Sequence, residues 1–185
     1  YLVESREVNA FAYAGRNLAV YTSLIEECET ENELLAVLGH EIGHIEKRHV
    51  VRSIKTNVGI SIVFSALLGD FSSIATSITT NHMSREFENE ADELSVEYLY
   101  NADIDPSGFA SFMKKMLTDT FLDHIDFFSD HPATQDRVNQ SEAKVKSLPE
   151  KKYITVLTAD EWTSFKNLLN KKQKKSSSND DENEE

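Results

Sequence analysis

LLAVLGHEIGHIEKRHVV, residues 34–51, is the stretch from which the rest of the chain can be interpreted. It contains the pattern H-E-x-x-H, formed by His40, Glu41 and His44. On an α-helix, residues four apart lie on one face, so both imidazoles can reach the same metal ion and Glu41 lies beside it. This is the arrangement of ligands and base in a zinc hydrolase. The alternative is a helix that carries two exposed histidines by chance.

The composition of the chain limits the partners that it can bind. The 185 residues are 39% hydrophobic and 28% charged, which is ordinary for one globular domain. A formal net charge of -13 argues against a nucleic-acid partner, because a phosphate backbone needs a basic face. Cys28 is the only cysteine, so no disulfide can form within the chain, and a metal site must use histidine and carboxylate ligands.

The H-E-x-x-H pattern lies in the middle of a predicted helix. Residues 30–33, Thr-Glu-Asn-Glu, form a capping box in which Thr30 caps the helix and Glu33 reaches back to it. The apolar residues that follow are expected to supply its buried side, namely Leu34, Leu35, Val37, Leu38, Ile42 and Ile45.

The residues before this helix favour strands. Three segments are rich in β-forming residues: 1–5, 8–13 and 18–22. The turn-like sequence Ala-Gly-Arg-Asn at 14–17 separates the last two. We therefore expect a small antiparallel sheet beside the helix.

Downstream segments predict further helices, a short strand and a tail. Helix start signals occur at Ser84, Asp105-Pro106, Asp130-His131-Pro132 and Thr158. Residues 153–157 favour a strand, and the Lys-rich, Ser-rich and acidic segment 171–185 is expected to be disordered. The chain is thus predicted to be a mostly helical α+β domain over residues 1–170, with a disordered charged tail at 171–185.

The most apolar run in the chain begins at Val58 and ends at Leu68. It is about half the length of the roughly 20 apolar residues that a membrane span needs, and Asp70 interrupts its continuation. Large apolar residues recur at helical spacing from Ile60, so the main expectation is a buried helix or helix pair. Peripheral membrane contact or self-association through residues 58–80 is the alternative.

A catalytic zinc usually has three protein ligands and one open position, so a third ligand is expected. In one class of enzymes the helix continues as H-x-x-G-x-x-H, but this chain has Lys47 and Val50 where that pattern needs glycine and histidine. In another class a glutamate comes from a separate helix. The predicted helix that starts after Ser84 carries three candidates near its start, Glu86, Glu88 and Glu90.

Four segments of the chain follow one another in an informative order. They are VNAFA at 8–12, HEIGHIEKRH at 40–49, SREFENEAD at 84–92 and SDHPATQDR at 129–137. Their combination resembles the gluzincin zinc metallopeptidases of the family that contains the HtpX-type heat-shock proteases and the CAAX prenyl-proteases, in its compact soluble, minigluzincin-like branch. The resemblance covers residues 8–140 and implies a zincin-like metallopeptidase fold, in which the small sheet lies beside the active-site helix.

The resemblance also implies roles for two carboxylates. The family pattern S-R-x-x-E-x-x-A-D supplies the third metal ligand and an orienting carboxylate, here Glu88 and Asp92. With the two histidines of H-E-x-x-H, Glu88 would hold one Zn²⁺ per chain. Residues four apart share a helix face, whereas Glu90 points about 160° away from Glu88. Glu86 and Glu90 are therefore expected to be solvated acidic residues.

The family motif H-P-x-x-x-x-R corresponds here to His131 and Arg137. The resemblance implies that Arg137 supports the site and that His131 faces the metal, where it would stabilise a developing oxyanion by about 3 kcal/mol. The same imidazole could instead bind the metal directly and act as a latch that holds the enzyme inactive. We leave three other histidines outside the metal set, namely His49, His82 and His124.

These residues together predict a zinc-dependent metalloendopeptidase with Glu41 as the general base and His131 as a second catalytic residue. Its substrate is expected to be an extended or misfolded protein segment that adds to a strand edge near Asn9 and Ala10. By resemblance we expect a role in protein quality control and a location in the bacterial cell envelope, periplasmic or peripheral to the membrane. The alternative is a latched or inactive zinc domain that acts as a chaperone-like binding or interaction module. An intact Glu41 counts against this alternative, because a structural zinc site needs no base.

Overall fold

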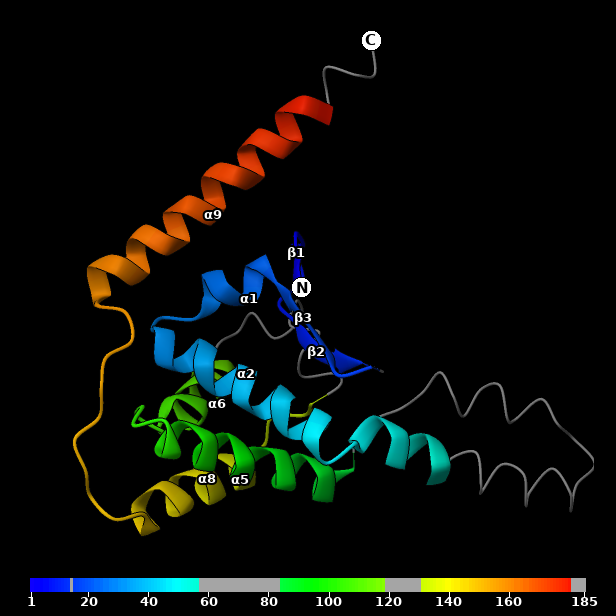
Figure 1. Ribbon diagram of the computed structural model, residues 1–185, viewed down its shortest axis with the longest axis vertical. Helices are drawn as coiled ribbons and strands as arrows, with labels where there is room; N and C mark the ends of the chain where they lie inside the picture. Colours follow the sequence, from blue (N-terminus) through cyan, green and yellow to red (C-terminus); the bar gives the residue numbers. More distant parts are fainter. Residues whose placement is uncertain (14, 57–83, 119–130, 181–185) are drawn as a thin grey trace, which may run out of the picture.

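The computed structural model describes residues 1–13, 15–56, 84–118 and 131–180, and the side chains of these ranges up to residue 170. The predictions for residues 58–80, His82 and His124 lie outside these ranges. Within them, no helix combines the length and the apolar character that are needed to cross a membrane. The described elements form a mostly helical α+β fold with one small sheet, as the sequence predicts (Figure 1).

The sheet has three strands in the order β1-β3-β2. Strand β1 is Leu2–Val3, β2 is Ala10–Tyr13 and β3 is Asn17–Tyr21. Strands β2 and β3 are antiparallel, as expected, but β1 pairs with β3 in parallel. The sheet is mixed because β3 inserts between two strands that run in opposite directions, so one of its two pairings must be parallel. Strand β2 lies at one edge, and no described strand pairs with it on its outer side.

Capping residues start the helices where the sequence places them. Helix α1 is Thr22–Glu27 and was not predicted, whereas α2 is Glu31–Glu46 and begins at the expected capping box. Thr30 Oγ1 accepts the N–H of Glu33, and Glu33 Oε2 accepts the N–H of Glu29. Residues 49–56 are again helical, and α5 follows as Arg85–Asn101, capped by Ser84 as predicted.

The later elements differ from prediction in three details. Helices α6, α8 and α9 are Gly108–Thr118, Gln135–Ser147 and Ala159–Asp180. Helix α8 begins after Thr134 rather than at Pro132, because the Thr134 hydroxyl caps the N–H of Arg137. The predicted strand at 153–157 is only a single bridge between Ile104 and Ile154, since no further partner strand lies beside it within the described ranges. The backbone of α9 is helical to Asp180, within the segment expected to be disordered.

Two glycines on α2 allow it to lie close to α5. A Cβ atom at Gly43 would lie 3.1 Å from Cα of Ala91, and one at Gly39 would lie 3.1 Å from Oγ of Ser95. Ser95 also donates a 2.6 Å hydrogen bond to the carbonyl oxygen of Ala36. Small residues on both helices therefore set a short separation between the H-E-x-x-H helix and the helix that carries Glu88.

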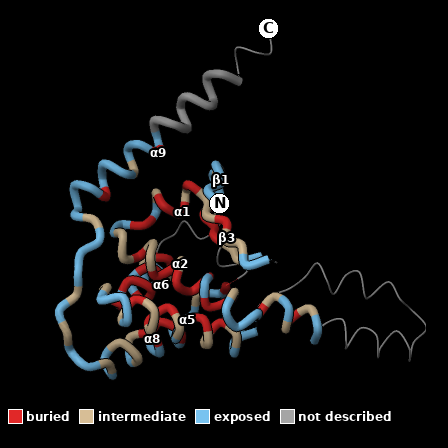
Figure 2. The backbone as a smooth tube through the Cα atoms, viewed as in Figure 1, coloured by how far each residue is buried: buried red, intermediate tan, exposed pale blue. Residues whose placement is uncertain are grey.

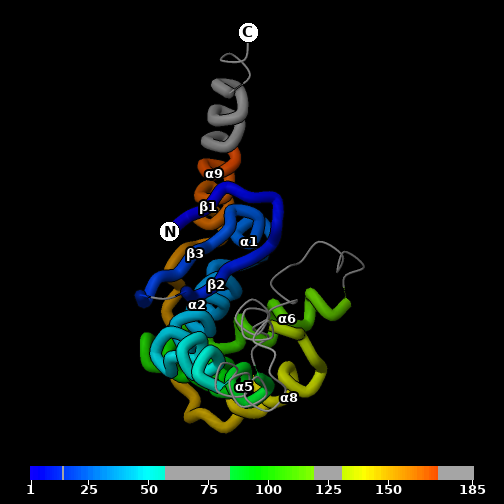
Figure 3. The backbone as a smooth tube through the Cα atoms, turned by 90° about the vertical axis from the view of Figure 1, so that its right-hand side faces the viewer, coloured from blue at the N-terminus to red at the C-terminus, as the bar shows by residue number. Residues whose placement is uncertain are grey.

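The buried residues of α2 include both histidines of the H-E-x-x-H pattern. Figure 2 shows buried segments along α2 and the elements around it. His40 and His44 are buried, whereas Ile42 is 44% exposed, so the prediction that Ile42 faces the core is wrong. The apolar core lies instead between α2, α6 and the sheet, around Phe109, Phe112 and Met113. Figure 3 shows the sheet, α1 and α9 toward one end of the molecule and α5, α6 and α8 toward the other, with α2 between them.

Candidate active site

Four buried side chains from three parts of the chain converge on one point. His40 and His44 come from α2, Glu88 from the first turn of α5, and His131 from the segment that precedes α8. One ligand atom of each lies within 4.8 Å of the ligand atoms of the other three. The structure thus brings together the three predicted metal ligands and the predicted second catalytic residue.

The spacing of the donor atoms fits a tetrahedral metal ion. Zinc bonds of about 2.0–2.1 Å in tetrahedral geometry separate neighbouring donor atoms by about 3.3 Å. Here Nε2 of His40 lies 3.0 Å from Nε2 of His44 and 3.5 Å from Oε2 of Glu88. Oε1 of Glu88 lies 3.4 Å from Nε2 of His44. Two imidazoles and one carboxylate are also a ligand set that zinc prefers, so the residues fit this ion.

His131 lies inside this cluster rather than at its rim. Its Nδ1 is 3.2 Å from Nε2 of His40 and 3.1 Å from each carboxylate oxygen of Glu88. Its Nε2 is 3.5 Å from Oε1 of Glu41. In this position the imidazole can serve as a fourth donor, or it can donate a hydrogen bond to a group that lies in the cluster.

One carboxylate oxygen of Glu41 accepts a hydrogen bond, and the other has no hydrogen-bond partner among the described residues. Its Oε2 accepts a 2.9 Å hydrogen bond from the backbone N–H of Ala12 in β2. Among the described residues, its Oε1 has no hydrogen-bond partner, and it faces Nε2 of His131. Burial raises the pKa of the Glu41 carboxyl above its usual range, although the charges of His131 and His40 oppose this shift. A carboxylate with a raised pKa is the better proton acceptor.

Asp92 contacts the Nδ1 side of His40, and Arg137 contacts Asp92. Nδ1 of His40 is 2.8 Å from Oδ1 of Asp92. Arg137 donates from Nε and Nη2 to the two carboxylate oxygens of Asp92, at 2.8 and 2.7 Å, and this bidentate pair is buried. A ligating imidazole that donates its other N–H to a carboxylate has its tautomer and ring orientation fixed, with Nε2 left to bind the metal. The structure therefore places Asp92 beside His40 and Arg137 beside Asp92, and the orienting roles expected for these two residues stay a prediction.

The charges inside the cluster favour a bound cation. Burial lowers the pKa of His40, but its hydrogen bonds with Asp92 and Glu88 outweigh burial and raise the pKa to about 9. Burial would raise the pKa of Glu88, but hydrogen bonds from His131 and His40 lower it below its usual range. Glu88 is thus anionic at neutral pH, and its negative charge favours a cation beside it.

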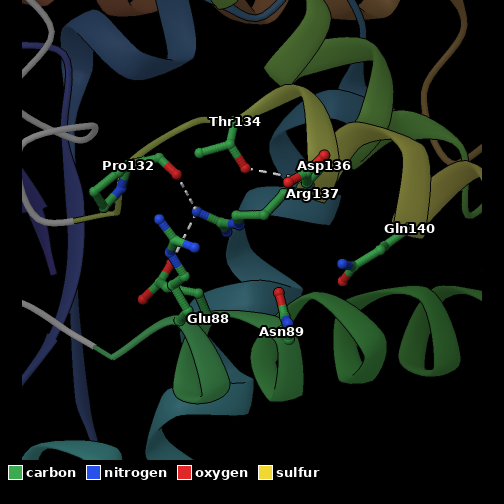
Figure 4. Close-up of a pocket in the computed structure, with 8 residues that line it drawn as sticks. Glu88, Asn89, Pro132, Thr134, Asp136, Arg137 and Gln140 are labelled. Atoms are coloured by element: carbon green, nitrogen blue, oxygen red, sulfur yellow. Dashed lines mark hydrogen bonds and ion pairs between the residues drawn. The ribbon is translucent and has the colours of Figure 1, made fainter.

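A pocket of about 450 Å³ lies next to the cluster. Figure 4 shows Glu88 and Asn89 of α5 on one side of it, with Pro132 and Arg137 on the other. Arg137 Nη1 donates to the carbonyl oxygen of Pro132 at 2.9 Å and lies 3.0 Å from Oε2 of Glu88. Arg137 therefore links the segment after His131 to Glu88 of the four-residue cluster, and the pocket lies beside this link.

Of the predicted substrate-binding residues, Ala10 is the first residue of the edge strand β2 and Asn9 directly precedes the strand, and their backbone groups point in opposite directions. The carbonyl oxygen of Asn9 accepts the N–H of Tyr21, so Asn9 faces β3. Because backbone groups alternate along a strand, those of Ala10 and Ala12 face the outer edge, where Ala12 reaches Glu41. The main chain at Ala10 thus faces the outer edge of β2, but Ala10 is completely buried, so the edge is covered at this position.

Sequence reasoning missed one side chain that contacts the cluster, His49, and the carboxylate of Glu90 that contacts His49 in turn. His49 is completely buried, and its Nδ1 lies 2.9 Å from Nδ1 of His44. Its Nε2 lies 3.0 Å from Oε2 of Glu90, which was expected to be solvated. The signal was hidden because the spacing between His44 and His49 does not fit one continuous helix.

Comparison with known proteins gives a consistent assignment. The profile of peptidase family M48 matches residues 1–145. The chain is 31% identical over 144 residues to the metalloprotease LoiP of Escherichia coli (strain K12), which covers 72% of this chain and 57% of LoiP. It is 27% identical over 136 residues to the beta-barrel assembly-enhancing protease of the same strain, which covers 63% of this chain and 28% of that protein.

A similar match is found outside bacteria. The mitochondrial metalloendopeptidase OMA1 of Arabidopsis thaliana is 28% identical to the chain over 137 residues, which covers 70% of this chain and 28% of that protein. The chain therefore spans little more than half of LoiP and less than a third of the other two relatives.

Proposed function

The chain belongs to peptidase family M48, and on this basis we propose that it is a zinc-dependent metalloendopeptidase that hydrolyses peptide bonds in extended or misfolded proteins. One observation carries the proposal: Nε2 of His40 and Nε2 of His44 lie 3.0 Å apart in a buried cluster, and each lies 3.4–3.5 Å from one carboxylate oxygen of Glu88, with Glu41 beside them. This combination of a ligand set and a base is what metal-assisted hydrolysis requires.

Each side chain has a defined task in the proposed reaction. His40, His44 and Glu88 would hold a zinc ion, which would supply a Lewis acid for the substrate carbonyl and lower the pKa of water. Glu41 accepts the proton of the attacking water at Oε1 and passes it to the departing amine. His131 donates a ring N–H toward the oxyanion that develops on the substrate.

The outer edge of β2 is the proposed docking site for the substrate backbone. An extended peptide can add by main-chain hydrogen bonds to a strand edge that has no partner strand, and the backbone groups of Ala10 face this edge. Ala10 is completely buried, so docking at this position would require the edge to be uncovered. Asn9 holds the start of this strand to β3, because its backbone carbonyl accepts the N–H of Tyr21. Its side-chain Oδ1 is buried and has no hydrogen-bond partner among the described residues. This mode selects flexible or unfolded segments, which agrees with a role in protein quality control.

Two further assignments belong to the proposal. We assign the catalytic domain to residues 1–170 and treat residues 171–185 as a charged tail. We also place the protein in the bacterial cell envelope, in the periplasm or peripheral to the membrane. The support is the similarity to a protease whose name refers to beta-barrel assembly.

Removal of the metal is expected to abolish cleavage. The zinc-loaded chain should cut unfolded casein, and a chelator should lower the rate by at least about a hundredfold, because Glu41 alone does not activate water sufficiently. Added Zn²⁺ should restore the rate, and added Mg²⁺ should not, since two imidazoles suit zinc and not magnesium. Undiminished cleavage by protein with no measurable zinc would contradict the proposal.

The position of His131 favours a second candidate function. Because its Nδ1 lies 3.1–3.2 Å from the donor atoms of Glu88 and His40, it can fill the fourth position of the metal and close the site. The protein would then be a latched zinc domain that binds unfolded chains in the manner of a chaperone.

Substitution of His131 separates the two candidates. If His131 acts on the oxyanion, His131→Ala should lower kcat on casein by about 10²–10³, as the loss of one such donor does. Zinc content, measured in the same samples, should stay at one equivalent per chain. A rise in kcat would instead show that His131 blocks the site.

A further inference from the structure

His49 lies outside the four-residue cluster, but it is buried like the predicted metal ligands and contacts one of them. Its side chain is completely buried, and both ring nitrogens have partners. Nδ1 lies 2.9 Å from Nδ1 of His44, and Nε2 lies 3.0 Å from Oε2 of Glu90. His49 therefore connects a predicted metal ligand on α2 to a carboxylate on α5.

A break in the helix makes this contact possible. In one continuous helix, His49 would lie about 140° around the axis from His44 and could not reach it. Helix α2 ends at Glu46 instead, and Arg48 has a φ of 55°, in the left-handed region. Such a backbone conformation is costly for a residue other than glycine, and it persists where the surrounding structure requires it. Here it turns the chain so that the His49 ring faces back toward His44.

The contact fixes which nitrogen of each ring carries the proton. Nε2 of His44 points toward the cluster, 3.0 Å from Nε2 of His40, and this is the nitrogen that would bind a metal. The proton of a ligating His44 is then on Nδ1, which donates to Nδ1 of His49. His49 must in turn carry its own proton on Nε2, where Glu90 accepts it.

The surroundings of His49 restrict its movement. Its ring stacks on Phe87, with the ring centroids 4.5 Å apart and the planes inclined by 3°. The guanidinium of Arg52 lies 4.3 Å from the centre of the same phenyl ring and donates to Oε2 of Glu90 at 2.9 Å. Glu90 is thus neutralised by Arg52, as Asp92 is by Arg137.

Each predicted imidazole ligand is therefore linked to a carboxylate through its Nδ1. His40 contacts Asp92 directly, whereas His44 reaches Glu90 through His49. We infer that His49 is a positioning residue that fixes the tautomer and the ring orientation of the metal ligand His44, with Glu90 and Arg52 holding His49 in place. This inference rests on the proposed function, because it requires that His44 binds a metal. Groups that orient a ligating histidine typically contribute about 10- to 100-fold to metal affinity.

Zinc affinity tests the inference independently of catalysis. His49→Phe keeps a flat ring next to Phe87 but removes both hydrogen bonds, and we expect it to raise the Kd for Zn²⁺ about 10- to 100-fold in competition with a chromophoric chelator. His49→Asn, whose side-chain oxygen can still accept the His44 N–H, should recover most of the affinity. The visible absorption of the Co²⁺-substituted protein should change in His49→Phe and return toward the wild-type spectrum in His49→Asn.

Glu90→Ala is a second test variant, because Glu90 contacts His49 and is partly exposed. We expect it to raise the Kd about tenfold. Glu86→Ala, which removes an exposed acid one turn earlier on α5, is the matched control and should leave the Kd unchanged. If His49→Phe unfolds, as circular dichroism would show, the Glu90 and Glu86 pair decides the question.

The outcomes distinguish the inference from the proposal beneath it. If the wild-type chain binds no zinc, both the metal site and the role of His49 are overturned. If the wild type binds one equivalent and folded His49→Phe and Glu90→Ala bind it equally tightly with unchanged Co²⁺ spectra, His49 is only a core residue and the metal site stands.

Discussion

Replacing Glu41 with glutamine is expected to lower kcat for casein cleavage by about 10²–10⁴ while the bound zinc remains. Glutamine has nearly the same shape as glutamate, and its amide oxygen can keep the hydrogen bond from the N–H of Ala12. It cannot accept a proton from water, so the general base is lost and the metal ligands are not disturbed. The loss should therefore be confined to the chemical step.

The measurement compares proteins of equal zinc content. Casein cleavage is followed for the wild type and for Glu41→Gln, with zinc determined on each sample. Glu46→Gln is the matched control, because Glu46 lies on the same helix, is exposed and bonds to the Tyr98 hydroxyl rather than to the site. It should cleave at the wild-type rate. Cleavage by Glu41→Gln at the wild-type rate would remove Glu41 from the mechanism.

The second large effect is expected from Glu88→Ala, which should lose the zinc. Glu88 is the only carboxylate among the four converging donors, so its loss removes the negative charge that holds the cation. A loss of about 4 kcal/mol corresponds to a Kd about a thousandfold higher. After dialysis against metal-free buffer, we expect one zinc per chain in the wild type and almost none in Glu88→Ala.

Glu90→Ala is the matched control for this experiment. Glu90 lies on the same turn of α5, but its carboxylate contacts His49 and Arg52 and not the cluster. Its weaker effect on affinity should leave the zinc in place through dialysis. If Glu88→Ala keeps one equivalent, the ligand set is wrong at that position. The double variant Glu88→Ala and His131→Ala would then show whether His131 has taken over as the third ligand.

Spacing rules were sufficient for the local parts of the site. The four-residue interval between His40 and His44 and the capping signals at Thr30 and Ser84 depend only on helix geometry, and the structure has both helices starting where expected. The interval between Glu88 and Asp92 follows the same rule. Such features are visible in a sequence because they depend on neighbours within one turn of helix.

The missed features depend on parts of the chain that are distant in sequence. Ile42 looked like a core residue, but the buried side of α2 is the one that faces α5, and Ile42 lies on another side. No glycine or asparagine marks the left-handed residue at Arg48, so the end of the helix and the return of His49 could not be foreseen. Residues 153–157 have strand propensity, but in the part of the chain that the structure describes they pair through a single bridge, between Ile104 and Ile154.

The origin of the four converging groups has a consequence for folding. They come from two helices and a loop that span residues 40–131, so a cation bound to all of them acts as a cross-link between distant parts of the chain. Because the unfolded chain cannot assemble this set, metal binding adds to the free energy of unfolding, by about 4 kcal/mol at a free concentration a thousand times the Kd. The availability of the metal would then set the lifetime of the protein as well as its activity.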